Sequence, residues 1–223
     1  MYRVAVAIPA LNARETIGEV ITGVSQFVPA SDIFVVDDGS SDETEMIARQ
    51  QGVWVLRHAA RRGKGAALRD AVRKILELNY DSIITLDSDL QHDPAEIPAF
   101  VSASERFDVV IGKRMISSNR MPIHRFMSNS ITTKMISIRT GVRIDDSQCG
   151  YRLYKTEVLK AVHSHRRHYD YESEILIKSA LAGFKIGFVP IKTIYNGSKS
   201  SIKVMDIIRF IGVYLASFAE PHD

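Results

Sequence analysis

The sequence predicts an α/β fold with a mostly parallel central sheet flanked by helices. Apolar, β-branched runs of strand length alternate with helix-length patterns through the first half of the chain, an order typical of parallel sheets. The runs are short and continuous, as strands buried on both faces are. Of the 223 residues, 45% are hydrophobic and 25% are charged, which is ordinary for a soluble globular chain.

Each element follows from a local pattern. The expected strands of the first half are residues 4–8, 32–36, 53–56, 82–86 and 108–111. The expected helices there are residues 16–27, 42–51, 64–78 and 94–105. Asp93 followed by Pro94 is a helix-start signal, because the carboxylate caps the first turn and proline suits the first helical position. After Lys113 the regularity fades, and the expected elements are a helix within 114–150, strands at 151–154 and 184–189, and helices at 172–182 and 202–218.

Composition excludes several classes of protein. The net charge is +3, from 29 Lys and Arg against 26 Asp and Glu, and no basic stripe is present, so we expect no nucleic-acid partner. The single cysteine, Cys149, excludes an intrachain disulfide. No apolar run reaches the roughly 18 residues of a membrane span, and the N-terminus lacks the features of a signal peptide. We expect one cytoplasmic domain, residues 1–223.

Acidic side chains follow two of the expected strands. Asp37 and Asp38 come after the second strand, and Asp87-Ser88-Asp89 comes after the fourth. In open α/β sheets ligands bind at the carboxyl ends of the strands. Two carboxylates there suit Mg²⁺ or Mn²⁺, which takes one or two carboxylates together with substrate phosphates. The alternative is that the Asp-x-Asp segment is a turn with helix caps.

Other nucleotide-binding signatures are missing. No phosphate-binding loop of NTPases occurs, and no Gly-x-Gly-x-x-Gly follows the first strand. The basic, glycine-rich segment 61–65 predicts a loop that approaches a nucleotide, with a solvated turn before a helix as the alternative.

The combined motifs resemble the inverting, family 2 nucleotide-sugar glycosyltransferases, which have the GT-A fold. Among these the chain is most similar to polyprenyl-phosphate (dolichol-phosphate type) mannosyl- and glucosyltransferases. The matching segments are 8–12, 36–42, 62–67, 86–94, 111–114, 146–152 and 172–174. The resemblance implies a Rossmann-like nucleotide-sugar half at 1–113, an acceptor half at 114–200 and an amphipathic helix at 201–219.

The resemblance also implies roles for single residues. Asp87, Asp89 and Gln91 would hold Mg²⁺ or Mn²⁺, and Asp89, Arg114 and Asp146 would be the catalytic residues. The donor, a GDP- or UDP-linked sugar, would contact Pro9, Leu11, Asp37, Asp38, Lys64, Asp87, Ser88, Asp89, Arg114 and Lys199. Arg125 would bind the acceptor phosphate. Many relatives have a tyrosine and a glutamate after the first strand, where this chain has Leu11-Asn12-Ala13, and an arginine where it has Ile194; Lys199 or Lys203 would replace that arginine.

The acceptor remains open between two chemical classes. A polyprenyl phosphate is already ionised and needs cations such as Arg125 to orient it. A sugar hydroxyl needs a carboxylate base within about 3 Å. The carboxylates available are Asp145, Asp146, Glu172 and Glu174.

Residues 202–218 predict a helix with its charges on one face and ten uncharged residues at 210–219. Such a helix suits a membrane surface, and the alternative is packing on the domain or on another subunit. A sugar nucleotidyltransferase and a non-catalytic nucleotide-binding module are the competing functions.

Overall fold

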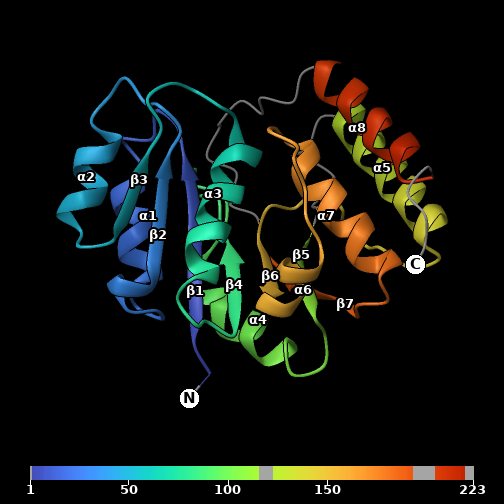
Figure 1. Cartoon of the computed structure of the whole chain (residues 1–223), viewed down its shortest axis with the longest axis horizontal. Helices are drawn as coiled ribbons and strands as arrows, with labels where there is room; N and C mark the ends of the chain where they lie inside the picture. The colour runs from blue at the N-terminus through green and yellow to red at the C-terminus, as the bar shows by residue number, and fades with distance from the viewer. Residues whose placement is uncertain (1, 116–122, 193–203, 219–223) are drawn as a thin grey trace.

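One seven-stranded sheet forms the centre of the computed structural model, which describes residues 2–115, 123–192 and 204–218 (Figure 1). Its strand order is β3-β2-β1-β4-β6-β5-β7. The strands are β1 (Val4–Ala10), β2 (Ile33–Asp37), β3 (Trp54–Arg57), β4 (Ser82–Thr85), β5 (Val109–Arg114), β6 (Arg152–Lys155) and β7 (Ile186–Ile191). Only β6 runs antiparallel to its neighbours, β4 and β5. The predicted, mostly parallel sheet is therefore confirmed.

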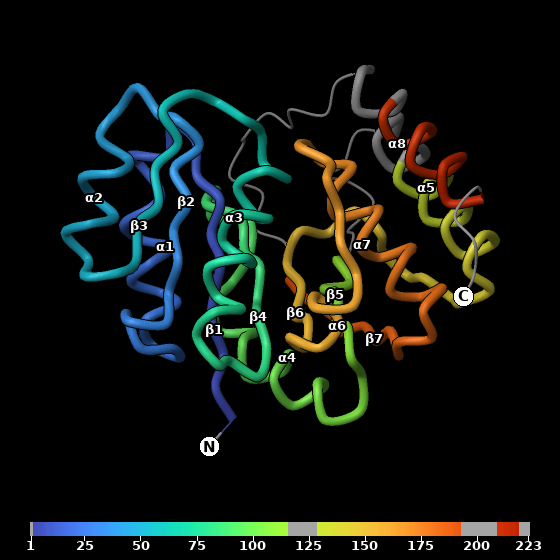
Figure 2. Tube along the Cα trace, viewed as in Figure 1, coloured from blue at the N-terminus to red at the C-terminus, as the bar shows by residue number. Residues whose placement is uncertain are grey.

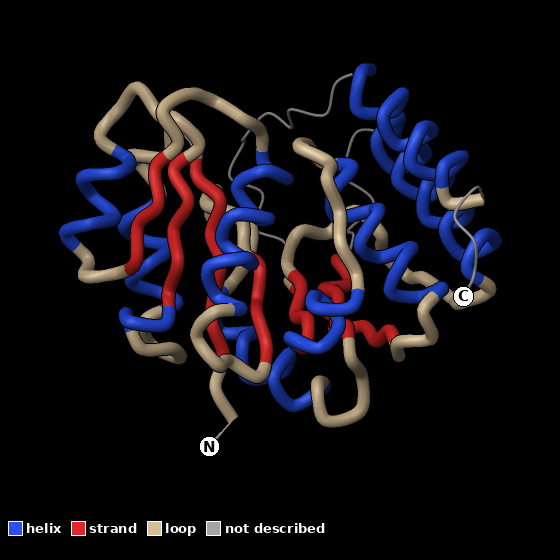
Figure 3. Tube along the Cα trace, viewed as in Figure 1, coloured by secondary structure: helices blue, strands red, loops and turns tan. Residues whose placement is uncertain are grey.

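Helices pack around the strands of the central sheet (Figure 3). The α-helices are α1 (Ile17–Val24), α2 (Thr44–Gln50), α3 (Lys64–Leu76), α4 (Ile97–Ala103), α5 (Ile123–Thr140), α6 (Thr156–Ala161), α7 (Asp170–Leu181) and α8 (Val204–Ala216). The 3-10 turns η1 (Ala30–Asp32) and η2 (Pro94–Glu96) complete the elements of the described residues. Helix α3 packs on β1, β2 and β4, whereas α4 packs on β5, β6 and β7.

The strand order reverses beside β1. Strand β1 pairs with β2 on one side and with β4 on the other, both in parallel. Such a switch point leaves a crevice beyond the carboxyl ends of the strands, where open α/β sheets bind ligands. The segments after β1, β2 and β4 therefore meet at one edge of the sheet.

Two features of the first half differ from the prediction. Strand β3 is not buried on both faces, because it is the edge strand, and about half of the Trp54 side chain is exposed. The helix expected at 94–105 begins as η2 and becomes α-helical only at Ile97. The predicted start signal is confirmed, since the Asp93 carboxylate accepts a hydrogen bond from the backbone N–H of Ala95.

The second half is less regular. Helices α5 and α8 lie side by side at the far end of the molecule, and both contact α7 (Figure 2). Nε of Arg139 on α5 donates to Oγ of Ser217 at the end of α8 over 3.0 Å. The sequence did not indicate α6, but it did predict helices at the places of α7 and α8.

Candidate active site

A buried ion-pair cluster lies where β4 and α3 meet the second half of the chain. Lys64, the first residue of α3, places its ammonium 2.6 Å from Oδ1 of Asp87 and 3.1 Å from Oε2 of Glu172. The other oxygen of Glu172, Oε1, is buried and has no hydrogen-bond partner within the described residues. One lysine therefore joins the segment after β4 to α7.

The charges of this cluster stabilise one another. Burial alone would lower the pKa of Lys64, but the negative charges of Asp87 and Glu172 outweigh it and raise that pKa above its ordinary value. Burial would likewise raise the pKa of Asp87, yet the Lys64 charge holds it below the ordinary value. Both groups are therefore charged at neutral pH.

Asp89 differs from Asp87 in its surroundings. Oδ1 of Asp89 accepts a hydrogen bond from the backbone N–H of Gln91, over 3.1 Å. Burial and the nearby negative charge of Asp87 raise the pKa of Asp89. A cation that binds between two carboxylates relieves their mutual repulsion and stabilises the ionised form of both.

The surrounding residues fix this segment. Oγ1 of Thr16 donates to the carbonyl oxygen of Ser88 over 2.6 Å. Burial lowers the pKa of His92 to about 4, so this imidazole, 3.9 Å from Oδ2 of Asp87, is neutral at physiological pH. Asp87, Ser88 and Asp89 thus sit on a loop whose backbone is held by Thr16 at the N-terminal end of α1.

These residues fit a divalent cation. No group of three or more His, Cys, Asp or Glu side chains lies in metal-binding positions in the part of the chain that the structure describes. Mg²⁺ and Mn²⁺ commonly take only one or two carboxylates and complete their shell with phosphate oxygens and water. Asp87 and Asp89 lie one residue apart just after β4, and two neighbouring carboxylates of this kind suit such a shared site.

The acidic pair after β2 is buried. Asp37 is fully buried; its Oδ1 accepts from the backbone N–H of Ser40, while its Oδ2 has no partner among the described residues. Asp38 accepts hydrogen bonds from the backbone N–H groups of Arg62 and Gly63, over 2.8 and 2.7 Å. Its carboxylate thus anchors the basic, glycine-rich loop to the end of β2.

The end of β1 is adjacent. Pro9 on β1 is in register with Val36 on β2, and both Pro9 and Leu11 are half-buried. The backbone N–H of Asn12 donates to Oγ of Ser40 over 2.8 Å. The segments after β1 and β2 are therefore bonded to each other.

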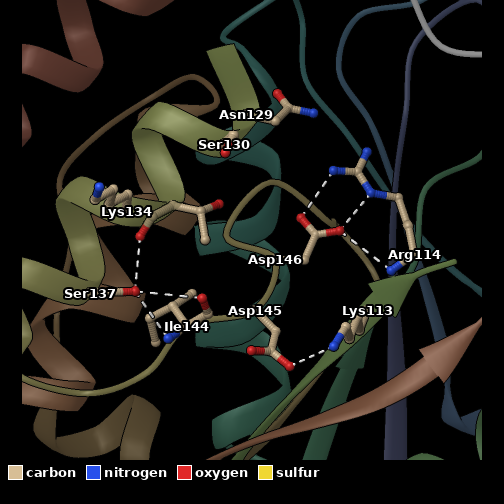
Figure 4. A pocket seen from close by; sticks show the side chains of 10 residues that line it. Lys113, Arg114, Asn129, Ser130, Lys134, Ser137, Ile144, Asp145 and Asp146 are labelled. Carbon is tan, nitrogen blue, oxygen red and sulfur yellow. Dashed lines mark hydrogen bonds and ion pairs between the residues drawn. The ribbon is translucent and has the colours of Figure 1, made fainter. Parts of the chain in front are cut away.

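A second polar region lies at the end of β5. Arg114 pairs with Asp146 through two bonds, Nε to Oδ2 over 2.8 Å and Nη2 to Oδ1 over 3.0 Å (Figure 4). Beside the pair is a pocket of about 420 Å³ between β5, α5 and the loop that precedes β6. Its lining residues are Lys113, Arg114, Asn129, Ser130, Thr133, Lys134, Ser137, Ile144, Asp145 and Asp146.

A buried arginine holds the loop that carries Asp146. Arg152 is 1% exposed and donates to the carbonyl oxygens of Ser147, Cys149 and Glu172. In that loop Gly150 packs directly on the cluster, because an added Cβ would lie 2.7 Å from Oδ2 of Asp87 and 2.8 Å from Nζ of Lys64. The two polar regions therefore share one wall.

The structure brings most of the predicted site residues to one edge of the sheet. These are Pro9, Leu11, Asp37, Asp38, Lys64, Asp87, Ser88, Asp89, Gln91, Arg114 and Asp146. Lys199, Lys203 and the side chain of Arg125 lie outside the described residues, and their roles stay predictions. No sequence pattern indicated the contacts of Thr16 or His92, because the fold alone brings these residues to the Asp87 segment.

Comparison with known proteins defines the class. Residues 5–163 match the family described as Glycosyl transferase family 2, and the chain belongs to that family. It is a glycosyltransferase, as the motifs predicted, rather than a nucleotidyltransferase. It is 30% identical to an undecaprenyl-phosphate mannosyltransferase of Micrococcus luteus, with 85% of this chain and 82% of that protein covered. It is 35% identical to an uncharacterized protein of Methanocaldococcus jannaschii, with 86% and 81% covered.

Solved structures support the fold. Glucosyl-3-phosphoglycerate synthase from Mycobacterium tuberculosis in complex with UDP superposes with a TM-score of 0.75 at 22% identity, over 99% of this chain and 81% of that one. The same enzyme has also been solved with Mn²⁺, UDP-glucose and phosphoglyceric acid, and that structure covers the same shares at 21% identity. The expected GT-A type fold is confirmed.

Proposed function

We propose that this glycosyltransferase moves a sugar from a GDP- or UDP-linked donor to a polyprenyl phosphate, with inversion at the anomeric carbon. Besides the Micrococcus mannosyltransferase, a polyprenol monophosphomannose synthase of Mycolicibacterium smegmatis is 29% identical to the chain. The names of both relatives support a lipid-phosphate acceptor. The competing acceptor is a glycan hydroxyl.

The pairing of carboxylates at the pocket carries the choice of acceptor. Both oxygens of Asp146 accept from Arg114. Asp145 lies between Lys113 at 2.8 Å and Arg143 at 3.0 Å. A hydroxyl acceptor requires a carboxylate that takes its proton, and a carboxylate held by cations is a poorer proton acceptor, whereas an ionised phosphate requires only cations. The pocket offers bound carboxylates and three cations, which favours the phosphate.

The donor belongs at the adjacent cluster. Asp87, Asp89 and Gln91 are the proposed holders of Mg²⁺ or Mn²⁺, and when bound that cation supplies positive charge to the leaving diphosphate. The proposed remaining donor contacts are Pro9, Leu11, Asp37, Asp38, Lys64, Ser88, Arg114 and Lys199.

Arg114 and Asp146 act together in this scheme. Asp146 fixes the guanidinium plane of Arg114 through two parallel bonds, so little side-chain freedom is left to lose when a phosphate binds. Arg114, the last residue of β5, lines the pocket, and the loop of its partner Asp146 leads to Gly150, which packs on Asp87 and Lys64. A group at the border of the pocket and the donor cluster can bind phosphate oxygens of either substrate.

Contact with a membrane surface belongs to the same proposal. Ile131 and Ile138 on α5, and Ile211, Leu215 and Phe218 on or after α8, are all exposed at their side chains. Within each helix they recur at three-, four- or seven-residue spacing, so they share a face. Exposed apolar side chains on two adjacent helices suit the interfacial layer of a bilayer. Across the described residues, no helix combines the length and the apolarity that crossing a bilayer requires.

Transfer assays test the acceptor directly. With Mn²⁺ present, radiolabelled UDP- and GDP-sugars are offered to the protein together with either undecaprenyl phosphate or a soluble oligosaccharide. We expect label to move to the lipid and to appear in the organic phase. Transfer to the oligosaccharide alone would overturn the lipid-phosphate acceptor and leave the glycan hydroxyl in its place.

A further inference from the structure

A buried hydrogen-bonded network of two carboxylates and a histidine lies behind the donor side of the site. His58 follows directly after β3, and only 5% of it is exposed. Nδ1 of His58 lies 2.7 Å from Oδ1 of Asp38, and Nε2 lies 3.1 Å from Oδ2 of Asp70 on α3. Both carboxylates are also buried. One imidazole therefore joins the end of β2 to the second turn of α3.

The partners of the two carboxylates define what the ring does. Asp70 also accepts from Nη1 of Arg62 over 2.7 Å, and Arg69 and Arg73 lie within 3.9 Å of it. Asp38 accepts from two backbone N–H groups. Each carboxylate is thus an acceptor toward the imidazole, and only a ring with a hydrogen on both nitrogens donates to both.

The network ends at the two residues that directly precede α3. The two backbone donors to Asp38 belong to Arg62 and Gly63. Gly63 has a φ of +103°, and an added Cβ would lie 2.3 Å from the carbonyl oxygen of Arg167. The chain at this point is therefore held from both sides. The next residue, Lys64, bears the ammonium that binds Asp87.

We infer that His58 and Asp70 are positioning residues for donor binding. They act through Asp38, which fixes the backbone of residues 62 and 63 and thereby the ammonium of Lys64 beside Asp87. Asp38 alone would be a buried carboxylate on a loop end, free to rotate away from the two N–H groups. The ring and Asp70 hold it in the one orientation that accepts both. This inference rests on the proposed use of Lys64 and Asp87 in donor binding.

Binding measurements on single and double variants test the network. The probes are UDP and GDP, each titrated calorimetrically with Mn²⁺ into wild type, His58→Ala, Asp70→Asn and the double variant. We expect each single variant to raise the Kd of the bound nucleotide about tenfold. The Kd of the double variant should not exceed that of the single variant with the higher Kd. Groups that act as one unit show such non-additivity.

A matched variant separates positioning from simple loss of stability. Asp108 is also a carboxylate that accepts from a lysine, Lys155, and from a backbone N–H, that of Lys185, but it precedes β5, at the opposite edge of the sheet. Asp108→Asn is expected to lower the Tm without changing the nucleotide Kd. In transfer assays the His58 and Asp70 variants should raise the donor KM and leave kcat within about threefold.

His58→Gln provides a smaller change should His58→Ala not fold, because its amide donates to one carboxylate only; an intermediate Kd is expected. If wild type binds a nucleotide and the folded variants bind it equally well, or if kcat falls while Kd stays constant, the positioning role is overturned and the proposed function stands. If wild type binds neither nucleotide, both proposals are overturned.

Discussion

Two regions of the molecule present different side chains. At the cluster around Lys64, partly buried charges have charged partners, as Lys64 has in Asp87 and Glu172. In the half that contains α5 and α8, ion pairs such as that of Arg143 with Asp145 face solvent, and large apolar side chains such as Ile138 and Leu215 are exposed. The same chain thus has one interior polar site and one exterior apolar face.

Under the proposed function, this difference matches what each region would bind. A small, highly charged ligand is bound best by charges whose orientation is fixed before it arrives, since little reorganisation is then needed. An apolar surface that binds a lipid layer has no pocket to fill. The buried apolar area therefore contributes more to its binding free energy than the orientation of single side chains does. The buried pairs and the exposed helices are consistent with a nucleotide donor and a lipid acceptor that meet at Arg114.

Loss of the second aspartate should have the largest effect. Asp89→Asn removes the carboxylate whose charge Asp87 already destabilises, and with it one of the three proposed metal ligands. We expect kcat/KM to fall about 10³-fold, which corresponds to roughly 4 kcal/mol of transition-state stabilisation. Initial rates at several Mn²⁺ concentrations measure it.

Asp93→Asn is the matched control, because Asp93 is a nearby carboxylate that caps η2. Its kcat/KM should stay within a few-fold of wild type. Equal losses in both variants would mean that the loop, rather than the Asp89 carboxylate, matters for activity.

The next largest effect is expected at Gly150, which packs against Asp87 and Lys64. A Cβ at position 150 would lie within 2.8 Å of both Asp87 and Lys64, so Gly150→Ala must displace one of them. Strain of this kind costs roughly 1–3 kcal/mol, and nucleotide Kd should rise about tenfold or more. Gly212→Ala, where nothing lies within 4 Å of the added Cβ, should bind nucleotide as wild type does. Unchanged binding in Gly150→Ala would show that the donor side tolerates movement of this pair.

Substitutions on the exposed apolar face of α5 and α8 should weaken vesicle binding without affecting nucleotide binding. Ile138→Ser with Leu215→Ser removes two exposed apolar side chains. Because each buried methylene is worth about 0.8 kcal/mol, we expect binding to anionic lipid vesicles in a flotation assay to weaken about tenfold or more. Nucleotide Kd should not change.

Met46→Ser on α2 is the control, as Met46 is also a half-exposed apolar residue but lies on the donor half. It should float with vesicles as wild type does. An equal loss of vesicle binding in Met46→Ser and in the double variant would mean that any exposed apolar side chain contributes to membrane contact. A concentration-dependent rise in mass that wild type and Met46→Ser show and the double variant loses would assign the face to contact between copies of the chain.

Much of the fold was predictable because its signals are local. Each of the first strands is a short apolar run, and the acidic residues directly follow two of these runs. The edge of the sheet at which these residues meet then follows from the parallel order alone. The exposure of β3 was not predictable in this way, because whether a strand is central or at the edge depends on the order of all strands. The helix predicted from residue 16 begins at Ile17, and the helix predicted from residue 42 begins at Thr44.

Site residues divide along the same line. Asp87 and Asp89 are recognisable from their spacing, whereas the pairing of Lys64 with Glu172 joins segments far apart in the sequence. His58 and Asp70 also belong to this group, since nothing in a lone histidine indicates two carboxylates around it. Contacts between distant segments depend on tertiary packing, which residue patterns do not encode one element at a time.

The smallest effect is expected at the amino ends of the strands, far from both substrates. The hydroxyl of Tyr80 donates to Oδ1 of Asp32 over 2.7 Å, and burial together with this bond raises the pKa of Tyr80 to about 12. The folded pKa exceeds the unfolded value of about 10, so the contribution to stability is complete below about pH 10 and is lost as pH rises toward about 12. Tyr80→Phe should lower the free energy of unfolding by about 1 kcal/mol at pH 8, and the difference from wild type should shrink above pH 10 in urea titrations. A constant difference would show that the hydroxyl contributes no proton-linked stability, and a changed nucleotide Kd would show that the edge opposite the site is coupled to it.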